Sequence, residues 1–382
     1  MSQENSNEIL DFEDLFESKP EAPKPRPLFS LNRAIISVVV YFVIMLLVAG
    51  VAVLFFYSDD RFTTDYTTIE SMFYNVSQDP NGVGYAQISY YQEYSADYTN
   101  LVVIYEGPQY VVFANRANPY LKDSYTLEMI QSFYLIEDIK WSNVRPSVYV
   151  ELYLFEDYQP FLNQIGVGAL VNTERVKTPQ AFTELTDSAS SILNFAIYIV
   201  LAIGVIPLTW SALKVDFDYF KQPLKKIGTE TVIGYGLMIM ASIGAQFATQ
   251  IIGYIADYAQ PVSLNQQAIE RSLLSSSGLF MILVTIIFAP VIEELIFRKA
   301  MFRFFKNQWL AMVISAVLFG LIHVSSETSF MAFFTNLITY SASGFALGYI
   351  YIRNKHNVWS VILVHAVSNA VSIAAILFLA LL

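Results

Sequence analysis

Long apolar runs without charge alternate with polar stretches along this chain, and they predict a bundle of membrane-spanning helices. The first run, Ala34 to Tyr57, contains no charged residue. As a helix it would be about 36 Å long, enough to cross the roughly 30 Å hydrocarbon core of a bilayer. Six further runs bring the expected number of spans to about seven: Ile192 to Leu213, Val232 to Ala256, Gly278 to Phe297, Trp309 to His323, Phe330 to Ile352 and Val358 to Leu382.

A different periodicity marks the polar segment between the first two spans, residues 58–190. Apolar and polar residues alternate there, as they do in half-buried strands. The alternating stretches are Ala86 to Tyr91, Leu101 to Tyr105, Tyr110 to Ala114 and Ser147 to Leu154. The Gly107-Pro108 step between two of them indicates a hairpin turn. We therefore expect an inserted β-rich or α+β domain of about 130 residues.

These patterns define the expected organisation of the chain. Residues 1–33 are polar, acidic and proline-bearing, which is typical of a disordered tail, and the first apolar run begins too late for a signal peptide. The protein is predicted to be an all-α polytopic membrane protein with an inserted extracytoplasmic domain. Its expected units are the tail (1–33), the first transmembrane helix (34–57), the inserted domain (58–190), two transmembrane helices with linkers (191–274) and a catalytic helical core (275–382).

Composition supports this class of protein. Of the 382 residues, 55% are hydrophobic and only 14% are charged, whereas soluble domains contain about 25% charged residues. The absence of cysteine excludes disulfides and a cysteine nucleophile. The net charge of −11 argues against nucleic acid as a partner. All of this excess lies in residues 58–190, which contain 18 Asp and Glu but 7 Lys and Arg, so this segment is expected to be a separate, water-exposed domain.

Basic residues in the short loops predict the orientation in the membrane. The loops after the second, fourth and sixth spans contain ten Lys and Arg, and those after the third and fifth contain Arg271 alone. The first set is therefore expected in the cytoplasm together with the amino terminus. The acidic domain and the carboxyl terminus are expected on the other side of the cell membrane.

Two adjacent carboxylates follow fifteen uncharged residues in the fourth span. On a helix Glu294 and Arg298 are four residues apart and can form an ion pair, whereas Glu293 points about 100° away from that pair. Pro290, four residues before Glu294, frees a backbone carbonyl. Ionisable groups within a membrane are functional candidates, and the alternative is a charge cluster at the cytoplasmic rim.

Two of the three histidines lie in apolar spans. His323 follows Phe319 by four residues, and His365 precedes Asn369 by four, so each pair shares a helix face. For each histidine taken singly, the alternative role is to form a hydrogen bond between helices. His356 lies in a basic loop and is expected to be solvated.

Together these residues form three ordered motifs: Glu-Glu-x-x-x-Arg, Phe-x-x-x-His and His-x-x-x-Asn. In this order on consecutive helices they resemble the CPBP intramembrane proteases, which include the Rce1-type CAAX prenyl endopeptidases and the bacterial Abi proteins. The resemblance covers roughly Ser275 to Leu382. It implies peptide hydrolysis within the membrane by the catalytic residues Glu293, His323, His365 and Asn369, with Glu294, Arg298 and Phe319 in support. Glu293 and His323 would activate water, and His365 with Asn369 would donate to the oxyanion.

The cofactor, the substrate and catalysis itself leave alternatives. No cofactor is required on the favoured interpretation; if zinc is present, its ligands would be Glu293, His323 and His365. The expected partners are the lipid bilayer and a membrane-associated protein or peptide substrate, and a ligand of the outer domain is a further candidate. The alternative functions are a non-catalytic binding or regulatory protein, as in bacteriocin immunity or signalling, and a transporter, for which no internal repeat is visible.

One geometric requirement follows from the motifs. His323 lies about 21 Å along its span from Trp309, while Glu293 is expected nearer the cytoplasmic side. The two side chains can meet only if the fifth span begins below the bilayer, tilts strongly or ends within the bilayer.

Overall fold

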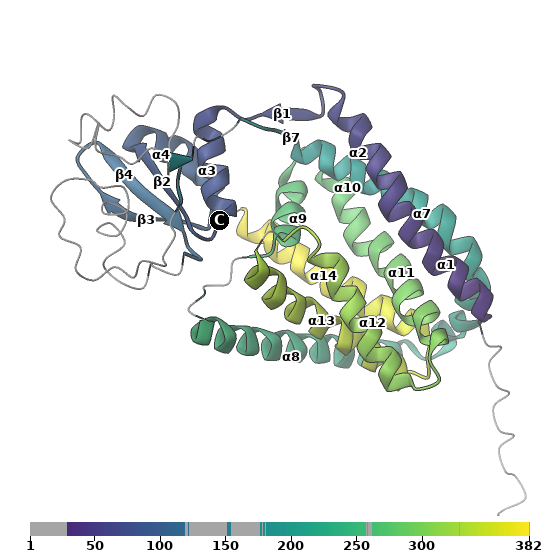
Figure 1. The fold of residues 1–382 in the computed structure, drawn as a ribbon. Helices are drawn as coiled ribbons and strands as arrows, with labels where there is room; N and C mark the ends of the chain where they lie inside the picture. Colours follow the sequence, from purple (N-terminus) through teal and green to yellow (C-terminus); the bar gives the residue numbers. More distant parts are fainter. Residues whose placement is uncertain are drawn as a thin grey trace, which may run out of the picture.

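The helices of this protein form one bundle, and an α+β domain is inserted into it (Figure 1). The computed structural model describes residues 29–118, 121, 151–153, 176–177, 179, 181–256, 258, 262–327 and 329–381. Within this part of the chain, six helices are long and apolar enough to cross a membrane: 31–57, 187–221, 224–256, 278–304, 330–353 and 358–379. The predicted fold class, a multi-pass membrane protein with an inserted β-containing domain, is confirmed.

The first span begins slightly earlier than its apolar run suggested. Helix α1 (Leu31–Val43) starts three residues before Ala34, because the Ser30 side chain accepts a hydrogen bond from the backbone N–H of Arg33 and so caps the helix. The helix continues through the π-helical turn η1 (Ile44–Val48) into α2 (Ala49–Tyr57). The predicted tail therefore loses its last residues to the helix, and residues 1–28 lie outside the described part of the chain.

The span that carries the glutamates is irregular. It comprises α10 (Gly278–Leu283), the π-helical η6 (Val284–Phe288), α11 (Ala289–Glu294), the π-helical η7 (Leu295–Ala300) and the 3₁₀ turn η8 (Met301–Phe304). In the most apolar stretch of this span, half of the residues are buried within the protein, whereas the share is 33% or less in the corresponding stretches of the other five spans. It is therefore the central helix of the bundle, surrounded by the others.

The remaining helices pack around this one. They are α7 (Asp187–Asp216), followed by the 3₁₀ turn η5 (Phe217–Lys221), then α8 (Leu224–Ala256), α12 (Gln308–His323), α13 (Phe330–Arg353) and α14 (Val358–Leu379). Figure 1 shows α1 and α2 running alongside α7, with which both are in contact. A short helix that the apolar runs did not predict, α9 (Leu264–Leu274), precedes the central helix.

Small residues allow α12 and α13 to approach each other closely at two points. A Cβ at Gly344 of α13 would lie 3.0 Å from the Cα of Ala316 in α12, and one at Gly348 would lie 2.7 Å from the Met312 side chain. Gly344 and Gly348 thus form a Gly-x-x-x-Gly packing motif. Because the two backbones approach closely there, α12 and α13 form a tight helical pair.

The inserted domain combines a five-stranded sheet with helices. The strand order is β3-β4-β2-β5-β6, with β2, β3 and β4 antiparallel and β2, β5 and β6 parallel. These strands are β2 (Gly82–Gln87), β3 (Leu101–Glu106), β4 (Tyr110–Asn115), β5 (Glu151–Tyr153) and β6 (Val176–Lys177). The predicted hairpin is present: β3 and β4 pair, and the Gly107 N–H donates to the Tyr110 carbonyl.

Helices α3 (Thr68–Gln78) and α4 (Ile88–Tyr94) complete this domain, and the 3₁₀ turn η2 (Ser95–Asp97) follows α4. The Phe73 ring of α3 stacks on Phe113 of β4 at 4.7 Å, and Gly84 leaves the space that Phe113 fills. The strand predicted from Ala86 to Tyr91 is wrong beyond Gln87, because the chain turns there into α4, whose tyrosines pack on the same core. Only residues 151–153 of the strand predicted from Ser147 to Leu154 are described.

A two-stranded ribbon connects the inserted domain to the bundle. Strand β1 (Thr63–Asp65) follows α2 after a short turn and pairs antiparallel with β7 (Thr183–Leu185), which leads directly into α7. Because the ribbon closes the insertion at its base, α2 and α7 are held next to each other at this end of the bundle.

Candidate active site

Glu294 is the centre of a buried polar cluster inside the bundle. Its Oε1 lies 2.8 Å from Nδ1 of His365, and its Oε2 lies 3.1 Å from Nε of Arg298. Glu294 and Arg298 are both fully buried, and His365 is 6% exposed. The ion pair predicted from the i, i+4 spacing is therefore present, and it extends to a histidine that lies 71 residues further along the chain.

Arg298 connects this cluster to two more helices. Its Nη2 donates to the carbonyl of Gly344 in α13 at 3.0 Å. Its guanidinium lies 5.1 Å from the centre of the Phe319 ring of α12, within the range of a cation–π interaction. A buried guanidinium needs such partners, so Arg298 fixes the positions of α12 and α13 relative to the central helix.

Phe319 is the aromatic hub of the site. Its ring centre is 4.5 Å from that of His323 and 6.1 Å from that of His365. One ring thus contacts both histidines as well as Arg298, although the three come from different helices. The requirement that His323 approach Glu293 is met, since the two residues interact electrostatically. Helix α12 has 16 residues and is about 24 Å long, less than the thickness of a hydrocarbon core, and it ends at His323.

The ring orientation of each histidine is set by one hydrogen bond. Nδ1 of His323 lies 2.7 Å from the Phe319 carbonyl, and the ring stacks on Tyr340 at 4.8 Å. A carbonyl can only accept, so Nδ1 of His323 carries the proton and Nε2 is directed elsewhere. In His365 it is likewise Nδ1 that faces Glu294, so both rings offer Nε2 for chemistry.

Glu293 has a separate partner. Its Oε1 accepts a hydrogen bond of 2.8 Å from the hydroxyl of Tyr198 in α7, and only 4% of the residue is exposed. It also lies close enough to His323 and Tyr41 for electrostatic interaction with both. The two adjacent glutamates thus face different neighbours, as the 100° rotation between them predicted.

Asn369 lies one turn beyond His365 on α14. Its Nδ2 donates to the carbonyl of Thr285 in the π-helical segment η6 at 2.8 Å. One amide hydrogen of Asn369 therefore connects α14 to the central helix.

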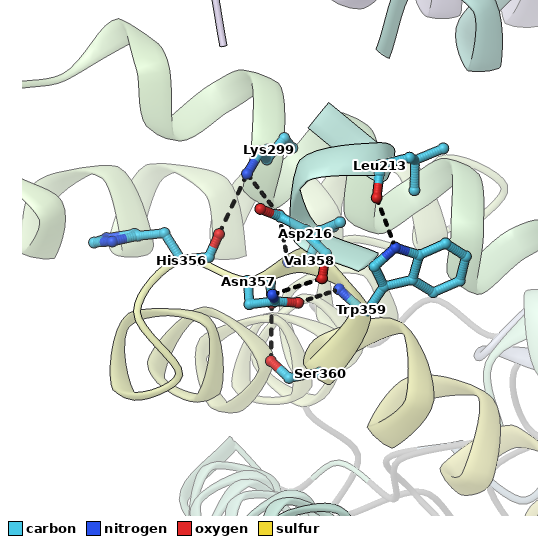
Figure 2. A network of polar contacts seen from close by, with 8 residues as sticks. All are labelled: Leu213, Asp216, Lys299, His356, Asn357, Val358, Trp359 and Ser360. Atoms are coloured by element: carbon cyan, nitrogen blue, oxygen red, sulfur yellow. Dashed lines mark hydrogen bonds and ion pairs between the residues drawn. The ribbon is translucent and has the colours of Figure 1, made fainter. Parts of the chain in front are cut away.

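A second polar network, at the end of the bundle opposite the β1–β7 ribbon, holds three elements in register (Figure 2). Asp216 at the end of α7 accepts from Nζ of Lys299 at 2.6 Å and from the backbone N–H of Val358 at 2.9 Å. The Asn357 side chain donates to the Asp216 carbonyl. Lys299 follows Arg298 directly and Val358 begins α14, so this network connects the helix of the glutamates to the helix of His365.

The turn before α14 has an unusual backbone that supports this network. Lys355 and His356 have φ values of 54° and 60°, a left-handed conformation that non-glycine residues rarely adopt. The His356 carbonyl then accepts from Nζ of Lys299 at 3.3 Å (Figure 2). His356 is exposed, as predicted, but one side of its ring packs on Tyr351 at 5.1 Å. The partial loss of solvent around the ring is the larger cause, and the nearby Lys299 charge the smaller cause, of a lowered pKa of His356.

The residues that the motifs did not reveal come from helices outside them. They are Tyr41 of α1, Tyr198 of α7, Tyr340 of α13 and Asp216 of α7. Tyr198 lies in an uninterrupted apolar run, where neither spacing nor charge distinguishes it from a core aromatic residue. Asp216 is followed two residues later by Asp218, so it gives only the weak signal of an acid that directly follows a span.

The described residues contain no group of three or more His, Cys, Asp or Glu side chains arranged to hold one metal ion. The ligand set expected for zinc was Glu293, His323 and His365. In the structure Glu293 faces Tyr198, and His365 faces Glu294 through Nδ1. Zinc binding by these residues stays a prediction for experiment.

The helices that contain these residues are similar to known proteins. Residues 275–371 match the family model described as type II CAAX prenyl endopeptidase Rce1-like. The predicted resemblance to this family is confirmed. The Rce1-like segment contains all four proposed catalytic residues and excludes α1, α7 and the inserted domain.

Curated proteins are similar to this chain over part of their length. The chain is 34% identical over 144 residues to "Putative membrane peptidase YdiL" of Bacillus subtilis (strain 168), which covers 35% of this chain and 54% of that protein. It is 41% identical over 54 residues to "UPF0177 protein YbdI" of Lactococcus lactis subsp. lactis (strain IL1403), covering 14% of this chain and 30% of that one. The chain thus spans about half or less of these relatives. No solved structure matches it.

Proposed function

We propose that this protein is an intramembrane endopeptidase that hydrolyses a peptide bond of a membrane-associated protein or peptide. The observation that carries the proposal is the buried cluster around Phe319, where a glutamate pair and two histidines from three helices meet inside the Rce1-like segment. Buried ionisable groups in a membrane protein are costly, and a cluster of them with matched partners is typical of a functional site.

The proposed mechanism assigns one role to each residue. Glu293 is the general base: it takes a proton from water and returns it to the leaving amine when the peptide C–N bond breaks. His323, which interacts electrostatically with Glu293, orients that water. Asn369 donates to the oxyanion that forms when water attacks the carbonyl, and His365 donates to it through Nε2–H in its doubly protonated form, with Nδ1–H held by Glu294. Glu294 and Arg298 hold His365 in place, and Phe319 keeps the two rings at a fixed separation. On this proposal no metal is required.

The orientation of the chain is part of the proposal. The ten-to-one bias of basic loop residues favours an amino terminus in the cytoplasm and an inserted domain outside the cell membrane. The site then lies closer to the cytoplasmic end, because Glu293 is six residues from Lys299 and His365 is seven residues from the start of α14. The substrate would present its bond in that half of the membrane.

A non-catalytic role remains the second candidate, and one observation favours it. The described part of the inserted domain forms a small polar cavity with the loop after His323, lined by residues such as Asn100, Asn115, Gln267 and Glu327. A domain in this position could transmit ligand binding to the bundle without any hydrolysis. On this alternative the same fold would bind a membrane partner, as in immunity or signalling.

The test compares membrane proteomes of cells that express the wild-type chain or Glu293→Gln, with new protein amino termini identified by mass spectrometry. Gln keeps an oxygen that can accept from Tyr198, so the variant is expected to fold. Glu230→Gln on α8, a partly exposed carboxylate outside the site that pairs with Lys226, serves as the control. We expect a fragment of a membrane protein that forms with wild type and Glu230→Gln but not with Glu293→Gln. Identical fragments in all three strains would favour the binding role.

A further inference from the structure

We propose that Tyr198 is the positioning residue of Glu293: its hydroxyl holds one carboxylate oxygen, so that the other is presented to the attacking water. This inference rests on the proposed function, because it assumes that Glu293 is the base. It adds a residue from α7, which lies outside both the three motifs and the Rce1-like segment.

The hydrogen bond has a defined direction. The Tyr198 hydroxyl lies 2.8 Å from Oε1 of Glu293, and an ionised carboxylate can only accept, so the phenol is the donor. A hydrogen bond to a charged acceptor is shorter and stronger than one between neutral groups. Glu293 is therefore restrained toward α7, and its Oε2 is the oxygen left for chemistry.

The tyrosine is itself held firmly. Its ring packs in two apolar clusters, one that includes Tyr41 and Leu201 and another that includes Met281 and Ile373. Tyr41, on the neighbouring α1, is 1% exposed and packs edge-to-face on Phe297 at 6.0 Å. A ring fixed on several sides places its hydroxyl reproducibly, which is what a positioning residue requires.

Among the described residues around Glu293, Tyr198 is the one that donates a hydrogen bond to its carboxylate. Several charged or titratable groups lie near this carboxylate: Glu294 and Arg298 on its own helix, Tyr41 of α1, Tyr198 of α7 and His323 of α12. His365 of α14 faces the adjacent Glu294. Glu294, Arg298 and His365 are engaged with one another, and Nδ1 of His323 is engaged with Phe319. Without the Tyr198 hydroxyl, the carboxylate would be free to change rotamer.

The first experiment is independent of any substrate. Full-length wild type and Tyr198→Phe, in liposomes, are treated with dicyclohexylcarbodiimide, a membrane-permeant reagent for protonated carboxyl groups, and the adducts are located by mass spectrometry. We expect the ratio of Glu293 to Glu294 labelling to rise by about tenfold in Tyr198→Phe, because the carboxylate loses a strong donor. Glu294 is the internal reference, since its partners are unchanged.

The matched control is Thr209→Val, which removes a fully buried hydroxyl from the same helix. We expect it to label as wild type does. Equal Glu293 labelling in wild type and Tyr198→Phe would overturn the proposal, as would the same rise in Thr209→Val.

The second experiment measures hydrolysis of an internally quenched, acyl-anchored peptide pool in the same liposomes. Tyr198→Phe is expected to lower the rate at saturating peptide by about 10- to 100-fold with an unchanged half-saturating concentration. A change in the half-saturating concentration alone would overturn the positioning role. If wild type and Glu293→Gln hydrolyse the pool equally while the labelling ratio still changes, the proposed function fails and the hydrogen bond stands.

Discussion

His365 Nδ1 lies 2.8 Å from Glu294 Oε1, so two helices that are far apart in the sequence share a buried polar contact. The same carboxylate pairs with Arg298, and the two adjacent glutamates consequently have different tasks. Glu294 joins helices, whereas Glu293 accepts a hydrogen bond from Tyr198 and interacts electrostatically with His323.

This division predicts unequal effects of two similar substitutions. Glu294→Gln leaves the buried Arg298 charge without its partner and should lower the free energy of unfolding by about 3 kcal/mol or more. Glu293→Gln should leave it nearly unchanged. Thermal unfolding in detergent, followed by size-exclusion chromatography, measures both. The control is Glu230→Gln, which removes an i, i+4 pairing with Lys226 at a site where the glutamate is partly exposed. Equal melting temperatures for the Glu293 and Glu294 variants would contradict the division.

Asp216 is expected to be structurally important although it touches no proposed catalytic residue. Asp216→Asn keeps an acceptor for the Val358 N–H but loses the ion pair with Lys299, and we expect a loss of about 1.5–3 kcal/mol in unfolding free energy. Asp218→Asn, two residues later, breaks an exposed pair with Lys221 and should cost at most about 1 kcal/mol. Chemical denaturation monitored by tryptophan fluorescence compares them, and a larger effect at Asp218 would refute the role of the network.

His356 should make stability depend on pH. Burial of its ring, followed by the charge of Lys299, lowers its pKa, and Asp216 offsets part of this effect. The folded state therefore binds fewer protons than the unfolded chain, so this contribution to stability is present above the unfolded pKa of about 6.5 and is lost as pH falls below it. Asparagine tolerates the left-handed backbone at this position, so His356→Asn should fold normally. In this variant the melting temperature should change less between pH 7 and pH 5 than it does in wild type. An unchanged pH slope would rule out His356 as the cause.

The metal-free mechanism predicts resistance to chelation. Hydrolysis in detergent should survive both EDTA and 1,10-phenanthroline, and the purified chain should contain well under one zinc per molecule by elemental analysis. His323→Ala and His365→Ala should leave that metal content unchanged. Stoichiometric zinc that is lost in either histidine variant, with activity lost on chelation and restored by zinc, would instead make Glu293, His323 and His365 its ligands.

Orientation can be tested directly because the chain has no cysteine. Gln109→Cys in the turn between β3 and β4, and Lys225→Cys at the start of α8, are both exposed positions. A membrane-impermeant maleimide applied to intact cells should label the first and should label the second only after lysis. The reverse pattern would place the inserted domain in the cytoplasm.

The sequence by itself determined the elements of the membrane part. Runs such as Ala34 to Tyr57 are too apolar for any other environment, and the i, i+4 spacing of Glu294 and Arg298 was enough to predict their ion pair. The hairpin at Gly107 also followed from local signals alone. Helical periodicity and turn chemistry are local properties, so they can be seen in a single segment of the chain.

The tertiary structure decided which of these elements meet. Nothing in the run around Tyr198 indicates that its hydroxyl reaches Glu293, and nothing near Gly344 indicates that its carbonyl accepts from Arg298. Only packing could show that α12 ends at His323 next to Phe319 and His365, and that the chain leaves its strand after Gln87 to form α4. Contacts between distant segments depend on helix crossings and on how side chains fill the space between them, and these are properties of the assembled fold.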